Sequence, residues 1–198
     1  MAGRPREFDT DAAIHKIRNV FWEKGFDATT MLDLIGATDV ASASLYSTFG
    51  SKIDMFRKAI VDYNTNEGGF AARALTEEPH ARDAIARMLT DAVMLFTNQE
   101  QPRGCMIVSS GLRMGAGNDE LLKWLSEQRT QRLASVFDRL RRGQEAGEIS
   151  QATDISSLAD FLTTVLQGLS IQAEDGMGRE RLLGIVEQTM KQYDIAVS

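Results

Sequence analysis

Hydrophobic residues recur at helical spacing along most of the chain. In its middle, apolar side chains fall three or four positions apart and share one helical face. These residues are Ile85, Met88, Leu89, Ala92 and Phe96. Comparable stripes run over residues 14–21, 121–140 and 182–193. Strand patterns are nearly absent and no proline follows Pro102, which leaves long segments free to be helical. The pattern predicts an all-α fold.

The segment from Ile155 to Gln172 differs because it is apolar on two sides. Leucines form one side and two other hydrophobic residues turn away from it; these are Leu158, Leu162, Leu166 and Leu169, against Phe161 and Val165. A helix with two apolar faces is expected to be buried on both. Gly168, unfavourable in mid-helix, could allow a second helix to approach closely there. Core packing within one chain would give a similar pattern, so the spacing alone leaves both explanations open.

Helix start and stop signals divide the first third of the chain into short pieces. Thr30 with Asp33, and Ser51 with Asp54, are capping boxes that predict two helix starts. Between them, Asp39 can adopt the left-handed conformation of a tight turn, and a helix restarts after Ala41. Helices this short need flanking helices as a platform. The arrangement predicts a helix-turn-helix, whose second helix is presented to the DNA major groove.

The outer side chains of that second helix are small and polar. Val40, Leu45 and Phe49 can point inward, which leaves Ser42, Ala43, Ser44, Tyr46, Ser47 and Thr48 outside. The serines can make single hydrogen bonds to bases and the alanine can contact a thymine methyl group. The candidate DNA-binding residues are Arg4, Arg6, Thr30, Ser42, Ala43, Ser44, Tyr46, Ser47, Thr48 and Lys52, with Tyr46 to Thr48 and Lys52 suited to phosphates.

The N-terminal segment AGRPRE has two interpretations. Pro5 disfavours helix at Arg4, so the segment is extended and could place Arg4 and Arg6 in the minor groove. A solvated tail fits the same residues equally well.

The stretch from Gly25 to Phe56, GFDATTMLDLIGATDVASASLYSTFGSKIDMF, resembles the DNA-binding signature of the TetR family of transcriptional repressors. The motif covers the first third of the chain, and the remainder is similar only in length and helical character. Asp39 stands where the family usually has Gly, and Ala41 where it usually has Ser or Thr. Each departure is expected to cost about 1 kcal/mol of local stability.

The resemblance implies a specific organisation. Residues 1–66 would form the helix-turn-helix domain, and residues 67–198 an effector-binding and dimerisation domain. Two copies would pair through the last two long helices and bind a pseudo-palindromic double-stranded DNA operator. A small effector, largely apolar, would release this repressor.

Composition adjusts this picture in two ways. The net charge is −6, and residues 1–66 hold eight lysines and arginines against nine aspartates and glutamates, so local placement of charge must favour DNA. No run of about 18 apolar residues and no signal-peptide pattern occur, which predicts no membrane span. A single cysteine fits a reducing cytoplasm.

Catalysis finds no support among the motifs. Neither H-E-x-x-H, a P-loop nor G-x-G-x-x-G occurs, and His15 has no second metal ligand beside it. We expect no enzyme, no metal and no cofactor.

Cys105 is the most distinctive residue of the second domain. It could line an effector pocket with apolar neighbours, for which the candidates are Met88, Phe96, Met106, Met114, Trp124, Phe137 and Phe161. Ordinary core packing would explain the same residues. Alternatively, Arg103 could lower the pKa of the Cys105 thiol and create a sensor of electrophiles or oxidants.

A function of a different class also fits the helical pattern. The chain would then be an all-helical protein-interaction module that does not bind DNA.

Overall fold

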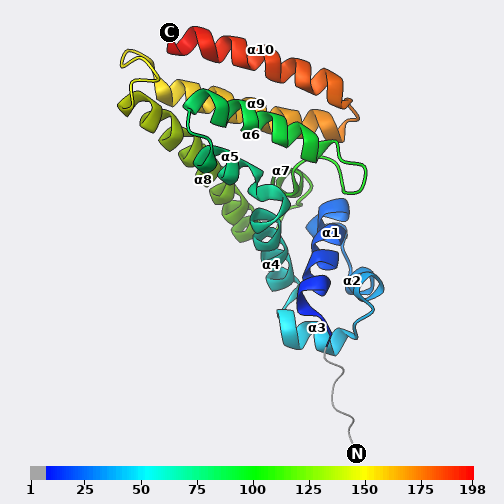
Figure 1. Ribbon diagram of the computed structural model, residues 1–198. Helices are drawn as coiled ribbons and strands as arrows, with labels where there is room; N and C mark the ends of the chain where they lie inside the picture. The colour runs from blue at the N-terminus through cyan, green and yellow to red at the C-terminus, as the bar shows by residue number, and fades with distance from the viewer. Residues whose placement is uncertain (1–7) are drawn as a thin grey trace, which may run out of the picture.

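The computed structural model describes residues 8–198 and confirms the all-α prediction, with no strand among them (Figure 1). Arg4 and Arg6, the predicted minor-groove contacts, lie outside the described residues. The helices are α1 (Thr10–Ala28), α2 (Met31–Thr38), α3 (Ser42–Phe49), α4 (Lys52–Thr65), a 3₁₀ turn η1 (Glu67–Gly69), α5 (Phe70–Glu77), α6 (Ala81–Phe96), α7 (Met106–Leu112), α8 (Asp119–Glu145), α9 (Ile155–Glu174) and α10 (Arg179–Val197).

One hydrophobic core joins α1 to α4 with α7 and the first turns of α8. Phe56 of α4 is its centre, because the rings of Phe21 and Phe26 pack edge-on against it at centroid distances of 5.2 Å and 5.3 Å. Trp22 packs in the same way against Tyr63, at 4.9 Å. These aromatic contacts provide the platform that the short α2 and α3 require.

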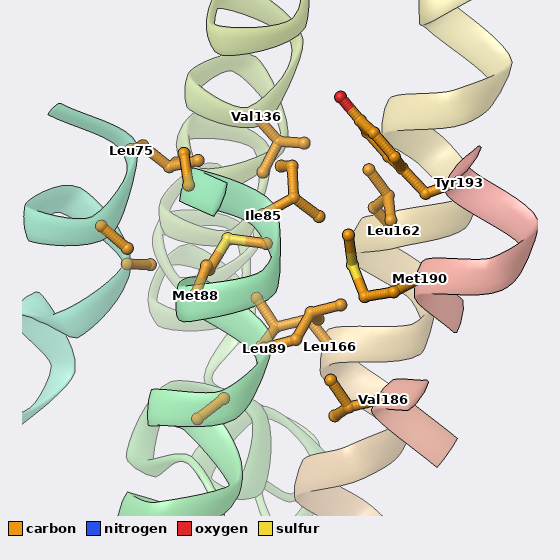
Figure 2. Packing of buried hydrophobic residues seen from close by; sticks show 14 of the residues in the cluster. Leu75, Ile85, Met88, Leu89, Val136, Leu162, Leu166, Val186, Met190 and Tyr193 are labelled. Carbon is orange, nitrogen blue, oxygen red and sulfur yellow. The ribbon is translucent and has the colours of Figure 1, made fainter. Parts of the chain in front are cut away.

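A second core lies between α5, α6, the C-terminal part of α8, α9 and α10. Figure 2 shows Leu89 of α6 beside Leu166 of α9 and Met88 directed toward Ile85, while Met190 of α10 lies on the other side of the cluster. The predicted stripes of α6 and α10 are confirmed, since their residues are buried, whereas Leu133 and Phe137 of the α8 stripe are half-buried.

Helix α4 runs from the α3 end of the molecule toward α5 and ends at Thr65, where the chain turns through η1 (Figure 1). The break contains the glycine pair Gly68 and Gly69. A Cβ on Gly68 would lie 2.4 Å from the Tyr63 ring, so only glycine lets the turn pass this close. Helix α5 after the break was not predicted as a separate element.

The turn between α7 and α8 is fastened to α1 within the first core. The Gly115 amide donates to Asp27 Oδ2 at 2.6 Å, and Asn118 Nδ2 donates to Asp27 Oδ1 at 2.9 Å. Asn118 occupies the N-cap position of α8, but its side-chain amide binds α1 and does not cap the helix.

The outer face of α9 and α10 remains open to solvent. On α9 the leucine side is buried as predicted, whereas Phe161 on the other side is 40% exposed. Ile171 and Ile185 are also exposed on these two helices. Among the described residues, no helix is both long and apolar enough to cross a membrane.

Candidate nucleic-acid interface

The start of α2 is held by the capping box that the sequence predicts. The Asp33 amide donates to Thr30 Oγ1 at 3.2 Å, and the Thr30 amide donates to Asp33 Oδ2 at 2.8 Å. Lys24 of α1 donates to the other carboxylate oxygen at 2.7 Å. The hydrogen bond from Lys24 holds the pKa of Asp33 well below its usual range, and the hydrogen bonds from Thr30 lower it further. This ties the exposed Thr30 and α2 to α1.

The turn between α2 and α3 has the conformation expected from Asp39. Its φ and ψ are 59° and 30°, and its amide donates to the Ile35 carbonyl at 2.8 Å. Ala41 then occupies the N-cap position of α3 without any side-chain hydrogen bond. The first amides of α3 are thus free to meet an acceptor outside the protein.

Helix α3 buries one face and presents the other, as predicted. Leu45 and Phe49 are buried against the first core, whereas Tyr46 is 47% exposed. Of the other candidate residues on this helix, Ala43, Ser47 and Thr48 are exposed and Ser42 and Ser44 are half-buried. Helix α3 lies at the end of the molecule farthest from α10, which leaves this face accessible (Figure 1).

Lys58 of α4 holds the C-terminal end of α3, a role that the sequence analysis missed. Its Nζ donates to the carbonyls of Thr48 at 3.3 Å and Phe49 at 3.1 Å, and lies 5.7 Å from the Phe49 ring centroid. A cation at this helix end is favourable because it meets unpaired carbonyls. The sequence signal for this role was the position of Lys58, two helical turns after Ser51.

Lys52 is half-buried at the start of α4, with its Nζ 4.5 Å from the Phe26 ring centroid. Burial lowers the pKa of Lys52, and the negative charges of Asp27 and Asp33 oppose this shift. The ammonium group thus lies near the box that starts α2. The predicted residues Thr30 and Lys52 flank α3 in the chain and mark the N-termini of the helices on either side of it.

A second candidate site is a cavity of about 40 Å³ between the two cores. Its walls come from α4 through α9: Tyr63, Phe70, Phe96, Cys105, Ile107, Val108, Gln128, Arg129, Arg132, Thr163, Leu166 and Gln167. Two predicted pocket residues, Phe96 and Cys105, line it. Met88 and Met106 are buried in the cores, Met114, Trp124 and Phe137 are half-buried elsewhere, and Phe161 is exposed.

Cys105 is half-buried at this cavity, and its amide donates to Ser170 Oγ at 2.8 Å. Arg103, the proposed activating cation, instead donates to the Met177 carbonyl at 2.9 Å. The sequence analysis missed the polar lining residues Tyr63, Thr163, Arg129 and Arg132. Only Thr163, which interrupts the apolar face of α9 beside Leu162, gave a signal in the pattern.

Taken together, the short capped helices and the open polar face of α3 define a DNA-binding regulator of the helix-turn-helix class. The family model for bacterial regulatory proteins of the tetR family matches residues 13–59, and the model for a tetracyclin repressor-like C-terminal domain matches residues 81–190. The chain belongs to the TetR family of bacterial regulatory proteins.

Individual relatives agree over nearly the whole chain. The HTH-type transcriptional repressor ComR of Escherichia coli is 30% identical over 190 residues, covering 96% of this chain and 90% of ComR. The Bacillus subtilis regulator YezE is 28% identical, covering 97% of this chain and 100% of its own length. A cysteine mutant of the regulator CifR, complexed with 26bp double-strand operator DNA, is 37% identical with a TM-score of 0.90, and the match covers 95% of this chain and 98% of CifR.

Proposed function

We propose that this protein is a cytoplasmic homodimeric repressor that binds a pseudo-palindromic operator and leaves it when a small effector occupies the cavity beside Cys105. The observation that carries the proposal is the outward face of α3, held by two capping boxes and by Lys58. A fold this close to that of CifR, which was solved on operator DNA, supports the same docking here.

The division of labour along the chain follows the break after α4. We propose that residues 1–66 bind DNA and residues 67–198 bind the effector and the second copy. The exposed apolar residues of α9 and α10 support a pairing face there. Two copies related by a two-fold axis would contact half-sites about one helical turn apart or a multiple of it.

The proposed roles on DNA follow from exposure and chemistry. Tyr46, Ser47 and Thr48 would contact phosphates, with Lys52 and Thr30 beside them, while Ser42, Ala43 and Ser44 would contact bases. Their side chains are too small for bidentate base recognition, so the sequence preference would depend strongly on DNA shape.

For the effector, we favour reversible binding of a molecule with a largely apolar body over covalent modification of Cys105. Arg103, the cation predicted to activate the thiol, donates to the Met177 carbonyl instead, and the loss of this predicted contact favours the reversible alternative.

Selection of bound fragments from a random duplex pool tests the DNA proposal and yields an operator for titrations. Lys52→Ala should weaken binding to all sequences and make the salt dependence shallower by about one unit of slope. Tyr46→Phe should also weaken binding without changing sequence preference. Ser44→Ala should instead change the preference at one or two base pairs.

Arg141→Ala, which removes an exposed cation near the C-terminal end of α8, is the matched control and should bind as the wild type does. Unchanged affinity and preference in all three α3 and α4 variants would overturn the assignment of the DNA-binding face.

A further inference from the structure

We propose that the effector cavity is selective for a small monocarboxylate: an anionic head bound by Tyr63, Thr163 and Arg132, with a short apolar body. This inference rests on the proposed function, because it specifies the ligand of the same cavity. Three observations support it: two buried hydroxyl groups without a partner, two arginines without a carboxylate partner, and the position of one of these arginines, Arg132, beside η1.

Two buried hydroxyl groups at the cavity have no partner within residues 8–198. Tyr63 is fully buried and Thr163 is 5% exposed, and neither the Tyr63 hydroxyl nor Thr163 Oγ1 makes a hydrogen bond there. Burial raises the pKa of Tyr63 well above its usual value, and the neighbouring Cys105 thiol adds to this. The phenol therefore stays protonated and can donate. A buried donor without a partner costs free energy, and an acceptor on the ligand would remove this cost by forming the missing hydrogen bonds.

The charged groups at the cavity all have the same sign. Arg129 and Arg132 lie three residues apart on α8, and the lining contains no aspartate or glutamate. Across the described chain, neither arginine has a carboxylate within salt-bridge distance. Guanidinium groups match the planar geometry of a carboxylate, so the cavity favours an anion over a neutral molecule of equal shape.

The remaining walls fit a short hydrocarbon body. Phe70, Phe96 and Leu166 supply apolar surface, and the enclosed space is small. Gln128 and Arg132 also line an outer groove of about 190 Å³ beside η1 and α5, so the cavity and the groove share these two side chains. A ligand that enters from this groove would meet Arg132.

Arg132 also connects the cavity to the DNA-binding domain. Its Nη2 donates to the Gly68 carbonyl at 3.2 Å, within η1, and its guanidinium lies 5.5 Å from the Phe70 ring centroid. In the same turn, Glu67 accepts a hydrogen bond from Arg18 of α1. A carboxylate that draws Arg132 away from Gly68 would loosen the turn that ends α4, and α4 begins directly after α3.

The test compares carboxylates with their neutral amides on the purified full-length protein. Sodium propionate and butyrate should raise the melting temperature and bind in calorimetry, whereas propionamide and butyramide should do neither. Arg132→Gln and Tyr63→Phe should each weaken butyrate binding about tenfold or more, because each removes a hydrogen bond to a charged group. Arg141→Gln, exposed on the same helix, is the control and should bind butyrate normally.

Tyr63→Phe keeps the ring and deletes only an unpartnered hydroxyl, so it should fold at least as stably as the wild type. It therefore decides the question even if Arg132→Gln fails to fold. Equal binding of acid and amide, or no binding of either carboxylate, would overturn the inference. Operator affinity measured alongside separates the two proposals: a carboxylate that binds the cavity without weakening operator binding contradicts the release model and leaves the ligand class supported.

Discussion

At the scale of single residues, Asp39 shows how the chain departs from the usual chemistry of its turn. Among the described residues it is the one non-glycine with a positive φ. The left-handed conformation is strained for residues with a Cβ, least so for Asp and Asn, whose short polar side chains can form local hydrogen bonds. Asp39 is thus a tolerated substitute for glycine in the turn that aims α3.

Substitutions at Asp39 should separate this strain from other effects. Asp39→Val should lower the free energy of unfolding by about 1–2 kcal/mol, because a β-branched residue is strongly disfavoured at positive φ. Asp39→Gly should be neutral or stabilise by up to about 1 kcal/mol. Urea denaturation measures both. If valine were tolerated as well as glycine, the strain argument would be wrong.

At the scale of elements, the helices with strong end signals could be predicted from the sequence. The capping boxes at Thr30 and Ser51 and the apolar stripes of α6, α9 and α10 match the structure. Helix α5 was missed because its eight residues follow the break after α4 directly and carry no cap signal. Of the cavity residues, Phe96 and Cys105 were predicted but Arg129 and Arg132 were not. An arginine on a helix gives the same sequence spacing whether its side chain faces solvent or another helix.

Gly68 tests whether the break between α4 and α5 depends on close packing. Gly68→Ala should destabilise the fold by about 1–3 kcal/mol, because the new methyl group would meet the buried Tyr63 ring. Gly184→Ala is the control: no atom lies within 4 Å of its Cβ position in α10, and removing a helical glycine should stabilise by about 0.5–1 kcal/mol. Similar denaturation midpoints for both variants would contradict the packing explanation.

At the scale of the whole molecule, the outer face of α9 and α10 leaves apolar residues of two long helices exposed. Phe161, Ile171 and Ile185 are exposed there, and the space beside Gly168 is open. Because the leucine side of α9 already packs in the second core, this outer face is available to a second copy. The sequence pattern could not separate core from partner packing, and the exposure of one side favours the partner.

Gly168→Leu should distinguish folding from assembly. No atom lies within 4 Å of its Cβ position, so the single chain has room for the larger side chain, and leucine should stabilise the helix by about 1 kcal/mol. In a dimer with crossing helices the same side chain would clash. We expect a sizing profile shifted toward monomer and weaker operator binding. Ser126→Leu on α8 is the control and should leave the profile unchanged; a dimeric Gly168→Leu variant would place the interface elsewhere.

The contact between Trp22 and Tyr63 gives the protein a built-in optical reporter. Trp22 is buried in the core that supports α3, and it contacts Tyr63, which lines the cavity, so this fluorophore lies between the two proposed sites. The other tryptophan, Trp124, lies half-buried under Arg57. With Trp124 replaced by phenylalanine, the remaining emission would come from Trp22 alone. Its intensity would then follow, in real time and without any attached dye, how occupation of the cavity is transmitted to α1.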